Sequence, residues 1–266
     1  MSIASLREAP ALPEIDLLGV GLHSITEEQC VEHILGELSA GRGGTVVTPN
    51  LDHLRRLCRD VEFRDLCERA SLRVADGRPL IWASKLQRTP LPGVVAGSNL
   101  IHSLSRAAGE RELRVFFLGG DPGTADDAAE ILSRRHPGLV VAGTSCPEFG
   151  FDRDESRMAE LVREVRASRA DIVFVALGSP KQEKLIERLR DELPEAWWLG
   201  IGISFSFVSG AVKRAPRWMQ KTGLEWVHRL TQEPRRLARR YLIDGLPFAL
   251  YLLSSSFFRG LRGSDS

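Results

Sequence analysis

Several residues that are able to do chemistry stand at the ends of short apolar segments in this 266-residue chain. Asp76 follows Val74-Ala75 and precedes a glycine, so its carboxylate is expected to project from the end of a strand. A carboxylate in that position is able to act as a general base and take a proton from an attacking hydroxyl. Asp is also a preferred helix N-cap, and a helical pattern follows, so on the motif alone capping is the stronger alternative.

A glycine-rich turn, Gly119-Gly120-Asp121-Pro122-Gly123, joins a predicted strand to a helix that begins near Thr124. Backbone N–H groups at a helix N-terminus favour a phosphate, although a plain tight turn explains the same glycines equally well. The spacing does not match G-x-G-x-x-G, and no acidic residue ends the next predicted strand. Both observations speak against a nicotinamide-dependent dehydrogenase.

A second strand-to-helix turn, Gly178-Ser-Pro-Lys-Gln-Glu183, places Lys181 and Gln182 where they are able to contact a diphosphate or a sugar hydroxyl. The turn lacks the Walker pattern of a P-loop. Asp152-Arg153-Asp154 has the D-x-D form that holds a metal on a nucleotide diphosphate in some glycosyltransferases. Because it directly precedes a helical pattern, we expect helix capping there and no metal site.

Short strands alternate with helices of ten or more residues along most of the chain, which is typical of a parallel sheet. Strands are predicted at 15–20, 44–48, 72–75, 114–118, 139–142, 172–177 and 197–201, with helices at 26–38, 51–69, 79–86, 98–108, 154–168 and 179–193 and another from about 124. The predicted fold is an α/β, Rossmann-like parallel sheet flanked by helices. In such folds the ligand binds outside the carboxyl ends of the strands, where Thr48, Asn50 and Asp76 are expected.

The C-terminal segment differs from the rest of the chain in charge. Residues 211–266 carry eleven Lys or Arg and four Asp or Glu, a local net charge of +7, while residues 1–210 carry −6. We therefore predict an α/β catalytic domain over 1–210 and a basic helical appendage over 211–266. Arginines beside the apolar stretch 242–258 suit an interfacial helix on anionic lipid, and arginine forks suit a diphosphate. A helix docked on the body or in a homo-oligomer interface is the alternative.

Composition bounds the remaining possibilities. Apolar residues make up 43% and charged residues 27%, and a net charge of +1 indicates no nucleic-acid partner. The first 13 residues lack a basic stretch followed by an apolar run, so no signal peptide is expected. No stretch contains some 20 clean apolar residues, so we expect no membrane crossing. The four cysteines show no metal-binding spacing, which favours reduced, structural thiols in the cytosol.

Taken together, these motifs resemble the WecG/TagA/CpsF family of bacterial glycosyltransferases. The resemblance rests on motifs that run in order over about 190 residues: Thr48-Pro-Asn50, Ala75-Asp-Gly77, Phe117-Leu-Gly-Gly120, Leu177 to Glu183, Arg214-Ala-Pro-x-Trp218, Gly223-Leu-Glu-Trp226, Arg229-Leu230 and Glu233-Pro-x-Arg236.

The resemblance implies an inverting, metal-independent transfer of a sugar from a UDP-sugar to a polyprenyl-diphosphate-linked saccharide, with no cofactor. N-acetylmannosamine-type sugars or glucose are the donors it implies, and cell-wall or exopolysaccharide synthesis is the setting. Asp76 would be the general base, while Thr48, Asn50 and Gln182 would line the sugar and nucleotide pocket. Cationic donors for the leaving diphosphate would come from the appendage, namely Arg229, Arg236 and Arg239, and Arg214 would also bind substrate. The enzyme would work peripherally on the inner face of the cell membrane.

The chain departs from the family pattern at two positions. Val94 stands where members commonly carry an arginine, so a contact to the acceptor or a diphosphate is missing or supplied elsewhere. Ser206 ends a turn in which the family has an aspartate. A nucleotide-sugar-binding regulator or scaffold that lost turnover is therefore the alternative function.

Overall fold

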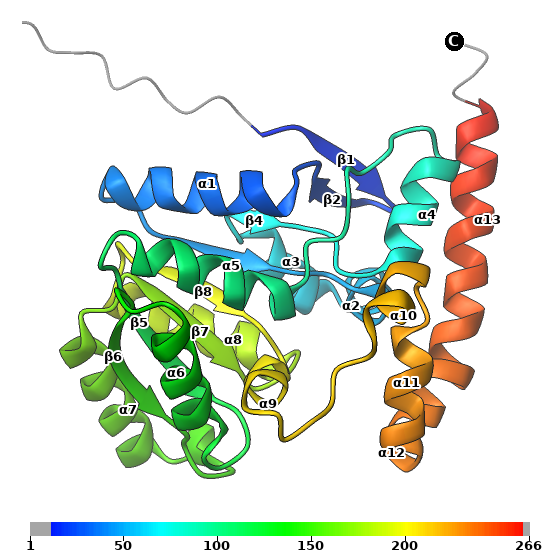
Figure 1. The fold of residues 1–266 in the computed structure, drawn as a ribbon. Helices are drawn as coiled ribbons and strands as arrows, with labels where there is room; N and C mark the ends of the chain where they lie inside the picture. The colour runs from blue at the N-terminus through cyan, green and yellow to red at the C-terminus, as the bar shows by residue number, and fades with distance from the viewer. Residues whose placement is uncertain (1–11, 263–266) are drawn as a thin grey trace, which may run out of the picture.

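A six-stranded, wholly parallel sheet forms the centre of the protein (Figure 1). The computed structural model describes residues 12–262; residues 1–11, where no signal peptide is predicted, and 263–266 lie outside that description. The strand order is β4-β3-β8-β7-β5-β6. The strands are β3 (Gly44–Val47), β4 (Leu72–Arg73), β5 (Arg114–Gly119), β6 (Val140–Ser145), β7 (Ile172–Ala176) and β8 (Trp197–Gly200). The predicted Rossmann-like α/β fold is confirmed.

Side chains alternate between the two faces of the sheet, and each face has its own core. Trp197 and Trp198 are consecutive in β8 and both are fully buried, but they belong to different cores on opposite faces. The first face is covered by α1 (Glu27–Ser39), α5 (Gly97–Gly109), α6 (Thr124–Arg135) and α9 (Ser204–Ser209). The second is covered by α7 (Glu155–Ser168) and α8 (Lys181–Leu189). Helices on both faces bury the near-continuous apolar strands.

Two N-terminal elements differ from the sequence prediction. The single strand expected at 15–20 is instead a hairpin of β1 (Glu14–Leu17) and β2 (Val20–His23). Leu18 and Gly19 turn the chain with positive φ angles of 56° and 81°, the backbone that a tight hairpin requires. The long helix expected to reach residue 69 is split into α2 (Leu51–Leu57) and α3 (Val61–Glu68). Asp60 starts α3 as its N-cap and accepts a hydrogen bond from the backbone N–H of Phe63.

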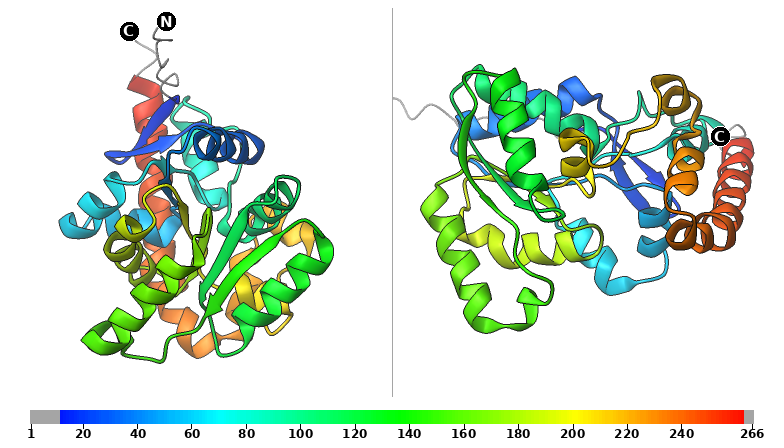
Figure 2. Two further views of the ribbon diagram at one scale, coloured as in Figure 1. Left: turned by 90° about the vertical axis from the view of Figure 1, so that its left-hand side faces the viewer. Right: turned by 60° about the horizontal axis from the view of Figure 1, so that its bottom comes forward.

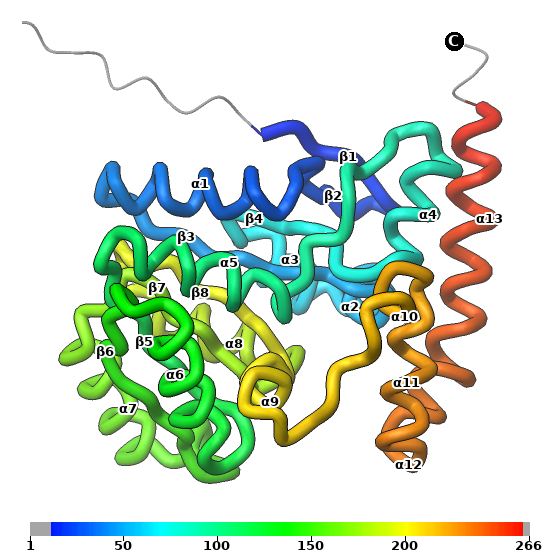
Figure 3. The backbone as a smooth tube through the Cα atoms, in the orientation of Figure 1, coloured from blue at the N-terminus to red at the C-terminus, as the bar shows by residue number. Residues whose placement is uncertain are grey.

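The basic C-terminal segment is helical, as predicted, and stands beside the sheet domain (Figure 1). A linker without regular structure leaves α9 and crosses to the first of these helices, which the tube drawing traces clearly (Figure 3). The helices are α10 (Arg217–Thr222), α11 (Glu225–Gln232), α12 (Pro234–Ala238), the π-helical segment η3 (Arg239–Gly245) and α13 (Leu246–Arg262). We call residues 211–262 the appendage.

The long helix α13 lies along α4 (Arg78–Leu86), and the rotated views show it at the outer side of the molecule (Figure 2). Its buried residues are Phe248, Leu252, Ser256 and Gly260, spaced four apart so that they share one face. A Cβ on Gly260 would lie 2.2 Å from the backbone oxygen of Leu86, so glycine is what permits this close approach. Large apolar side chains of α13 stay exposed outside this docked face: Leu246 and Leu250 line the crevice described below, and Tyr251 and Phe258 do not.

The continuous helix Pro234–Arg262 is long and apolar enough, by length and composition, to cross a membrane. It has 29 residues, and its most apolar 18-residue window has a mean hydropathy of 1.3 with 17% of that window buried. The helix contains no run of some 20 clean apolar residues, so the expectation that the chain does not cross a membrane stays a prediction. Docking of one α13 face on α4 holds the helix against the body of the protein.

Candidate active site

A crevice of about 2580 Å³ opens at the carboxyl ends of the strands, between the sheet domain and the appendage. This is the place where ligands bind in parallel α/β sheets. Nine of the eleven predicted site residues line it, and Gly119 and Arg239 do not. The nine are Thr48, Asn50, Asp76, Gly120, Lys181, Gln182, Arg214, Arg229 and Arg236.

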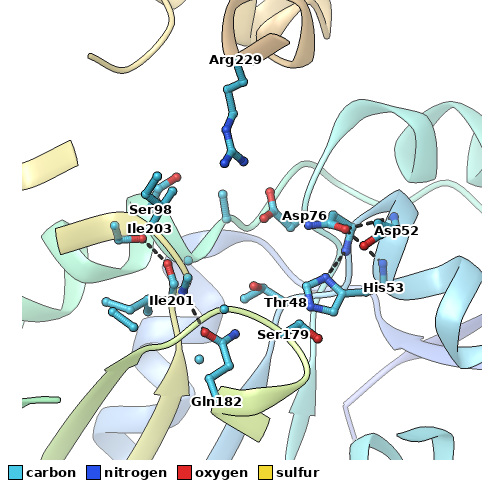
Figure 4. A pocket seen from close by; sticks show the side chains of 18 of the residues that line it. Thr48, Asp52, His53, Asp76, Ser98, Ser179, Gln182, Ile201, Ile203 and Arg229 are labelled. Carbon is cyan, nitrogen blue, oxygen red and sulfur yellow. Dashed lines mark hydrogen bonds between the residues drawn. The ribbon is translucent and has the colours of Figure 1, made fainter. Parts of the chain in front are cut away.

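Asp76 is free of any capping role. The N-cap of α4 is Gly77, which has φ 113° and provides no side-chain hydrogen bond. The Asp76 backbone N–H donates to the Pro49 oxygen at 2.8 Å, which fixes the strand end. Within residues 12–262 its carboxylate has no hydrogen-bond partner, and it faces the crevice below Arg229 (Figure 4). The capping alternative is therefore wrong, and the carboxylate is available for chemistry.

Burial first, and then the nearby negative charge of Glu225, raise the pKa of Asp76, which comes to about 7. The positive charges of His53, Arg214 and Arg229 act in the opposite direction. Although the crevice leaves the residue partly accessible, its surroundings exclude most water. A general base is most effective when its pKa lies close to the working pH, so this value suits proton transfer near neutrality.

Asn50 and Thr48 both lie at the end of β3 but differ in which of their polar atoms are free to bind a ligand. Asn50 is the N-cap of α2, and its Oδ1 accepts hydrogen bonds from the backbone N–H groups of Asp52 at 3.0 Å and His53 at 3.1 Å. Only the amide NH₂ of Asn50 remains for a ligand. The Thr48 side chain is 8% exposed and lines the crevice directly.

Gln182 is 4% exposed, and both ends of its amide are already bonded within the protein. Its Oε1 accepts from the Gly202 N–H at 3.0 Å, and its Nε2 donates to Glu183 Oε1 at 3.0 Å. A Cβ on Gly200 would lie 2.6 Å from that Nε2. The geometry therefore gives Gln182 a structural part in shaping the crevice, fixing the turn after β8.

The site also contains a buried pair of side chains, His53 and Glu183, that the sequence did not predict. His53 Nε2 lies 3.6 Å from Glu183 Oε1, and both side chains are almost fully buried. Burial alone would raise the pKa of Glu183, but the interactions with His53 and Gln182 lower it on balance. His53 is one of six histidines scattered through the sequence, and nothing in the sequence places it beside a residue 130 positions away. The available signal was Glu183 itself, a charged residue within an otherwise recognisable turn.

Of the two glycines of the glycine-rich turn that were predicted to contact substrate, only Gly120 lines the crevice. Gly120 lines the crevice, and its N–H donates to the Ala176 oxygen at 2.7 Å. Gly119 is buried beneath it with φ 92°, and a Cβ there would lie 2.8 Å from the Leu177 side chain. Gly119, predicted as a substrate contact, is therefore a packing residue outside the crevice.

Two further predictions concern Lys181 and the Asp152-Arg153-Asp154 pattern. Lys181 is exposed at the edge, with its Nζ 4.6 Å from the centre of the Phe149 ring. Asp154 is the N-cap of α7 and accepts hydrogen bonds from the N–H groups of Ser156 and Arg157. The capping interpretation of the D-x-D pattern is confirmed for Asp154.

The appendage brings arginines over the crevice from the side opposite the strand ends. Arg214 donates to the Ser98 oxygen at 3.3 Å and lies 3.7 Å from Glu225. Arg229 points into the crevice above Asp76 and Thr48 (Figure 4). Arg236 pairs with Glu233 at 2.5 Å, which raises its pKa.

Arg239, predicted to join this set, is exposed and lies outside the crevice, so this prediction is wrong. Arg240 lines the crevice in its place and pairs with Asp52 at 3.1 Å. Asp52 also pairs with Arg55, which in turn reaches Asp244 at 3.4 Å. This chain of ion pairs connects η3 to α2 beside the site.

The two positions that depart from the family pattern both line the crevice. Val94 packs on the core under α4 and offers no charge. Ser206 is 2% exposed, and its hydroxyl donates to Asp121 Oδ2 at 3.3 Å. A carboxylate therefore remains at this end of the crevice, supplied by Asp121 from the glycine turn.

The fold and the crevice are those of an α/β enzyme. The crevice holds a carboxyl group whose pKa is raised to about 7, and arginines that suit an anionic substrate. The glycosyl transferase WecG/TagA/CpsF family profile matches residues 15–262, so the chain belongs to this family. One relative, from Bacillus spizizenii, is 34% identical over 202 residues, covering 76% of each chain. Another, from Bacillus subtilis, is 31% identical over 197 residues, covering 74% of this chain and 75% of its own. Both are named N-acetylglucosaminyldiphosphoundecaprenol N-acetyl-beta-D-mannosaminyltransferase.

Proposed function

We propose that the protein transfers a sugar, of the N-acetylmannosamine type or glucose, from a UDP-sugar to a polyprenyl-diphosphate-linked saccharide. Asp76 takes the proton from the acceptor hydroxyl as its oxygen bonds to the anomeric carbon. The bond from that carbon to the UDP oxygen breaks, and the electron pair leaves with UDP. A single displacement of this kind inverts the anomeric configuration. The names of the two relatives support the acceptor class.

The leaving diphosphate is neutralised by arginines in this proposal. Arg214, Arg229 and Arg236 all line the crevice, and Arg229 lies above Asp76 (Figure 4). Guanidinium groups bind phosphate oxygens in a bidentate manner and stabilise negative charge as it develops. Because these cations serve the leaving group, we propose that transfer needs no metal ion and continues in the presence of a chelator.

We further propose that residues 1–210 form the catalytic domain and 211–266 a membrane-associating appendage at the inner face of the cell membrane. The exposed apolar side chains of α13 and the flanking arginines support this location. A helix with one apolar face outward and basic residues at its end suits the lipid interface. Docking of the other face on α4 favours a peripheral position over a span.

The observation that carries the proposal is Asp76, a carboxyl group with a pKa raised to about 7 that caps no helix and faces the arginines. The decisive experiment incubates the protein with a panel of UDP-sugars and a short-chain polyprenyl-diphosphate-linked N-acetylglucosamine. Acceptor-dependent UDP release and an extended lipid-linked product are expected. Nucleotide binding without release of UDP for any donor would favour the regulator or scaffold instead, an alternative that the Val94 and Ser206 departures raise.

A further inference from the structure

Arg78 is a crevice residue that the roles described so far leave unused. It is the first residue of α4, two positions after Asp76, and it lines the crevice. Its Nε is buried without a hydrogen-bond partner. Among residues 12–262 no carboxylate forms an ion pair with it, whereas Arg214, Arg236 and Arg240 all have acidic partners. A half-buried guanidinium without a counter-charge is a strong anion-binding group.

The stem of Arg78 is held in place by neighbours from both walls. Trp82 lies four residues on, so it shares the same face of α4. Gly223, at the turn between α10 and α11, packs on both residues, since a Cβ there would lie 3.0 Å from each. Gly223 also has φ 77°, a conformation that favours glycine. The appendage therefore closes directly over Arg78 and Trp82.

Beyond Arg78 the crevice wall becomes apolar. Trp82 is 43% exposed, and α13 adds a row of aliphatic side chains to the same crevice: Leu246, Ala249, Leu250 and Leu253. Val94, which also lines the crevice, adds no charge. Arg78 thus stands where the polar part of the crevice that contains Asp76 meets an apolar part lined by Trp82 and by side chains of α13. A ligand that fills both parts has an anionic group attached to a hydrocarbon chain.

We infer that Arg78 binds the diphosphate of the lipid-linked acceptor, and that Trp82 with the α13 side chains holds the first isoprene units. The inference rests on the proposed function and adds a separate subsite to it. The appendage arginines Arg229 and Arg236 serve the donor diphosphate, and Arg78 serves the acceptor diphosphate. The same arrangement positions the acceptor sugar near Asp76. Arg78 also provides a cation in a crevice where Val94 occupies the position at which the family commonly has an arginine.

The direct test is binding of geranylgeranyl diphosphate to the full-length protein, measured by calorimetry below the critical micelle concentration. Arg78→Met is expected to weaken this binding about thirtyfold, the effect of losing a charged hydrogen-bond pair. Lys85→Met is the matched control, because Lys85 is exposed on the same helix and lies outside the crevice. Unchanged UDP affinity and melting temperature in Arg78→Met show that the variant is folded with its donor site intact. Equal binding by Arg78→Met and the wild type would overturn the inference.

Related probes separate the two parts of the ligand. Trp82→Ala is expected to weaken geranylgeranyl diphosphate but not inorganic diphosphate, and geranylgeraniol is expected to bind poorly to every form. Adsorption to anionic vesicles should be unchanged in Arg78→Met, because the site takes a single lipid diphosphate. If Arg78→Met lost vesicle binding and lipid diphosphate binding to the same degree, Arg78 would be a general membrane contact and the inference would fail.

A rescue variant tests the role in turnover. In Arg78→Met, the KM for the lipid-linked acceptor should rise while the KM for the donor stays unchanged. Adding Val94→Arg restores a cation to the same crevice, and it should recover part of the acceptor affinity. These kinetic results require an active enzyme, but the calorimetric binding does not. Failure of transfer with every donor would therefore count against the proposed function, while loss of the Arg78 effect on binding would count against this inference alone.

Discussion

The two walls of the crevice are held in very different ways. On the sheet side, Asp76, Thr48 and Gln182 come from strand ends and from a turn that internal hydrogen bonds fix. On the appendage side, Arg229 and Arg236 stand on short helices that follow an irregular linker, and α11, which carries Arg229, has no buried residue. Few buried contacts and short elements mark the parts of a protein that open most easily. The base is therefore rigidly placed, whereas the cations stand on the part of the molecule that opens more easily.

Asp76→Asn removes the proposed base from the sheet side of the crevice and has the largest expected effect. Transfer should fall by about a thousandfold or more, because the amide is unable to accept the proton. Binding of UDP should remain, since the arginines are untouched. The measurements are UDP release and calorimetric UDP affinity. Asp152→Asn, an exposed carboxylate at the edge of the same crevice, should leave transfer almost unchanged. Full activity in Asp76→Asn would refute its role as the base.

Replacing Arg236 tests the appendage wall. Arg236→Ala should reduce kcat by about a hundredfold, the usual loss for one donor to developing negative charge. Arg239→Ala should reduce it much less, because this side chain is exposed outside the crevice. The two variants remove the same group from neighbouring turns, so general loss of basic charge affects them equally. Similar losses of kcat in both variants would mean that Arg239 also faces the substrate, contrary to the structure.

The pH dependence of kcat/KM reports the environment of the fixed wall. Asp76 must be ionised to act as a base, and its pKa is raised to about 7. Below that pH, kcat/KM should therefore fall by about tenfold per pH unit. An activity that stays constant down to pH 5 would show that the carboxyl group has an ordinary pKa.

The same raised pKa affects stability. Between about pH 4, where an unfolded Asp titrates, and pH 7, the folded protein binds the proton more strongly than the unfolded chain. This contribution to stability is complete below the unfolded pKa and is lost as the pH rises through the folded pKa. Asp76→Asn should therefore raise the melting temperature more at pH 8 than at pH 5. An equal change at both pH values would contradict the assignment.

The outer face of the appendage can be tested without disturbing its docking. Ile243 and Phe258 are 68% and 60% exposed, so changing both to Glu should leave the fold intact. Sedimentation with anionic vesicles should fall several-fold, because apolar insertion and charge attraction are both weakened. Val61→Glu is the control, an equally exposed apolar residue on α3. Unchanged sedimentation of the double variant would show that this face does not contact lipid.

The sequence predicted the sheet and most of the site because both depend on short-range patterns. Apolar runs that end at Asn50, Asp76 or Gly120 mark strand ends, and parallel strands end at one edge. The hairpin at Leu18-Gly19 was missed because a single strand and two strands with a two-residue turn give similar apolar patterns. The deciding feature is the positive φ of both turn residues, which residue types indicate only weakly.

The parts of the site that the sequence did not predict depend on long-range packing. The His53–Glu183 pair joins residues 130 positions apart, and its members look ordinary by themselves. Arg239 and Arg240 are adjacent arginines, and only the packing of the appendage on the sheet domain decides that Arg240 lines the crevice. Asp121 meets Ser206 because α6 and α9 pack together on one face of the sheet. None of these contacts has a local sequence signal.

Asn50 gives the smallest expected effect and the finest distinction between holding the site together and binding substrate. Asn50→Ala removes the N-cap of α2 and should lower the free energy of unfolding by about 1 kcal/mol, measured by urea denaturation. Asn50→Asp keeps the capping oxygen and should retain that stability, while it replaces the amide NH₂ with an acceptor. If Asn50→Asp is stable but has a higher donor KM, the NH₂ group contacts the sugar nucleotide, as the family resemblance implies. If activity and stability both stay at the wild-type level, Asn50 serves the fixed wall only as a helix cap.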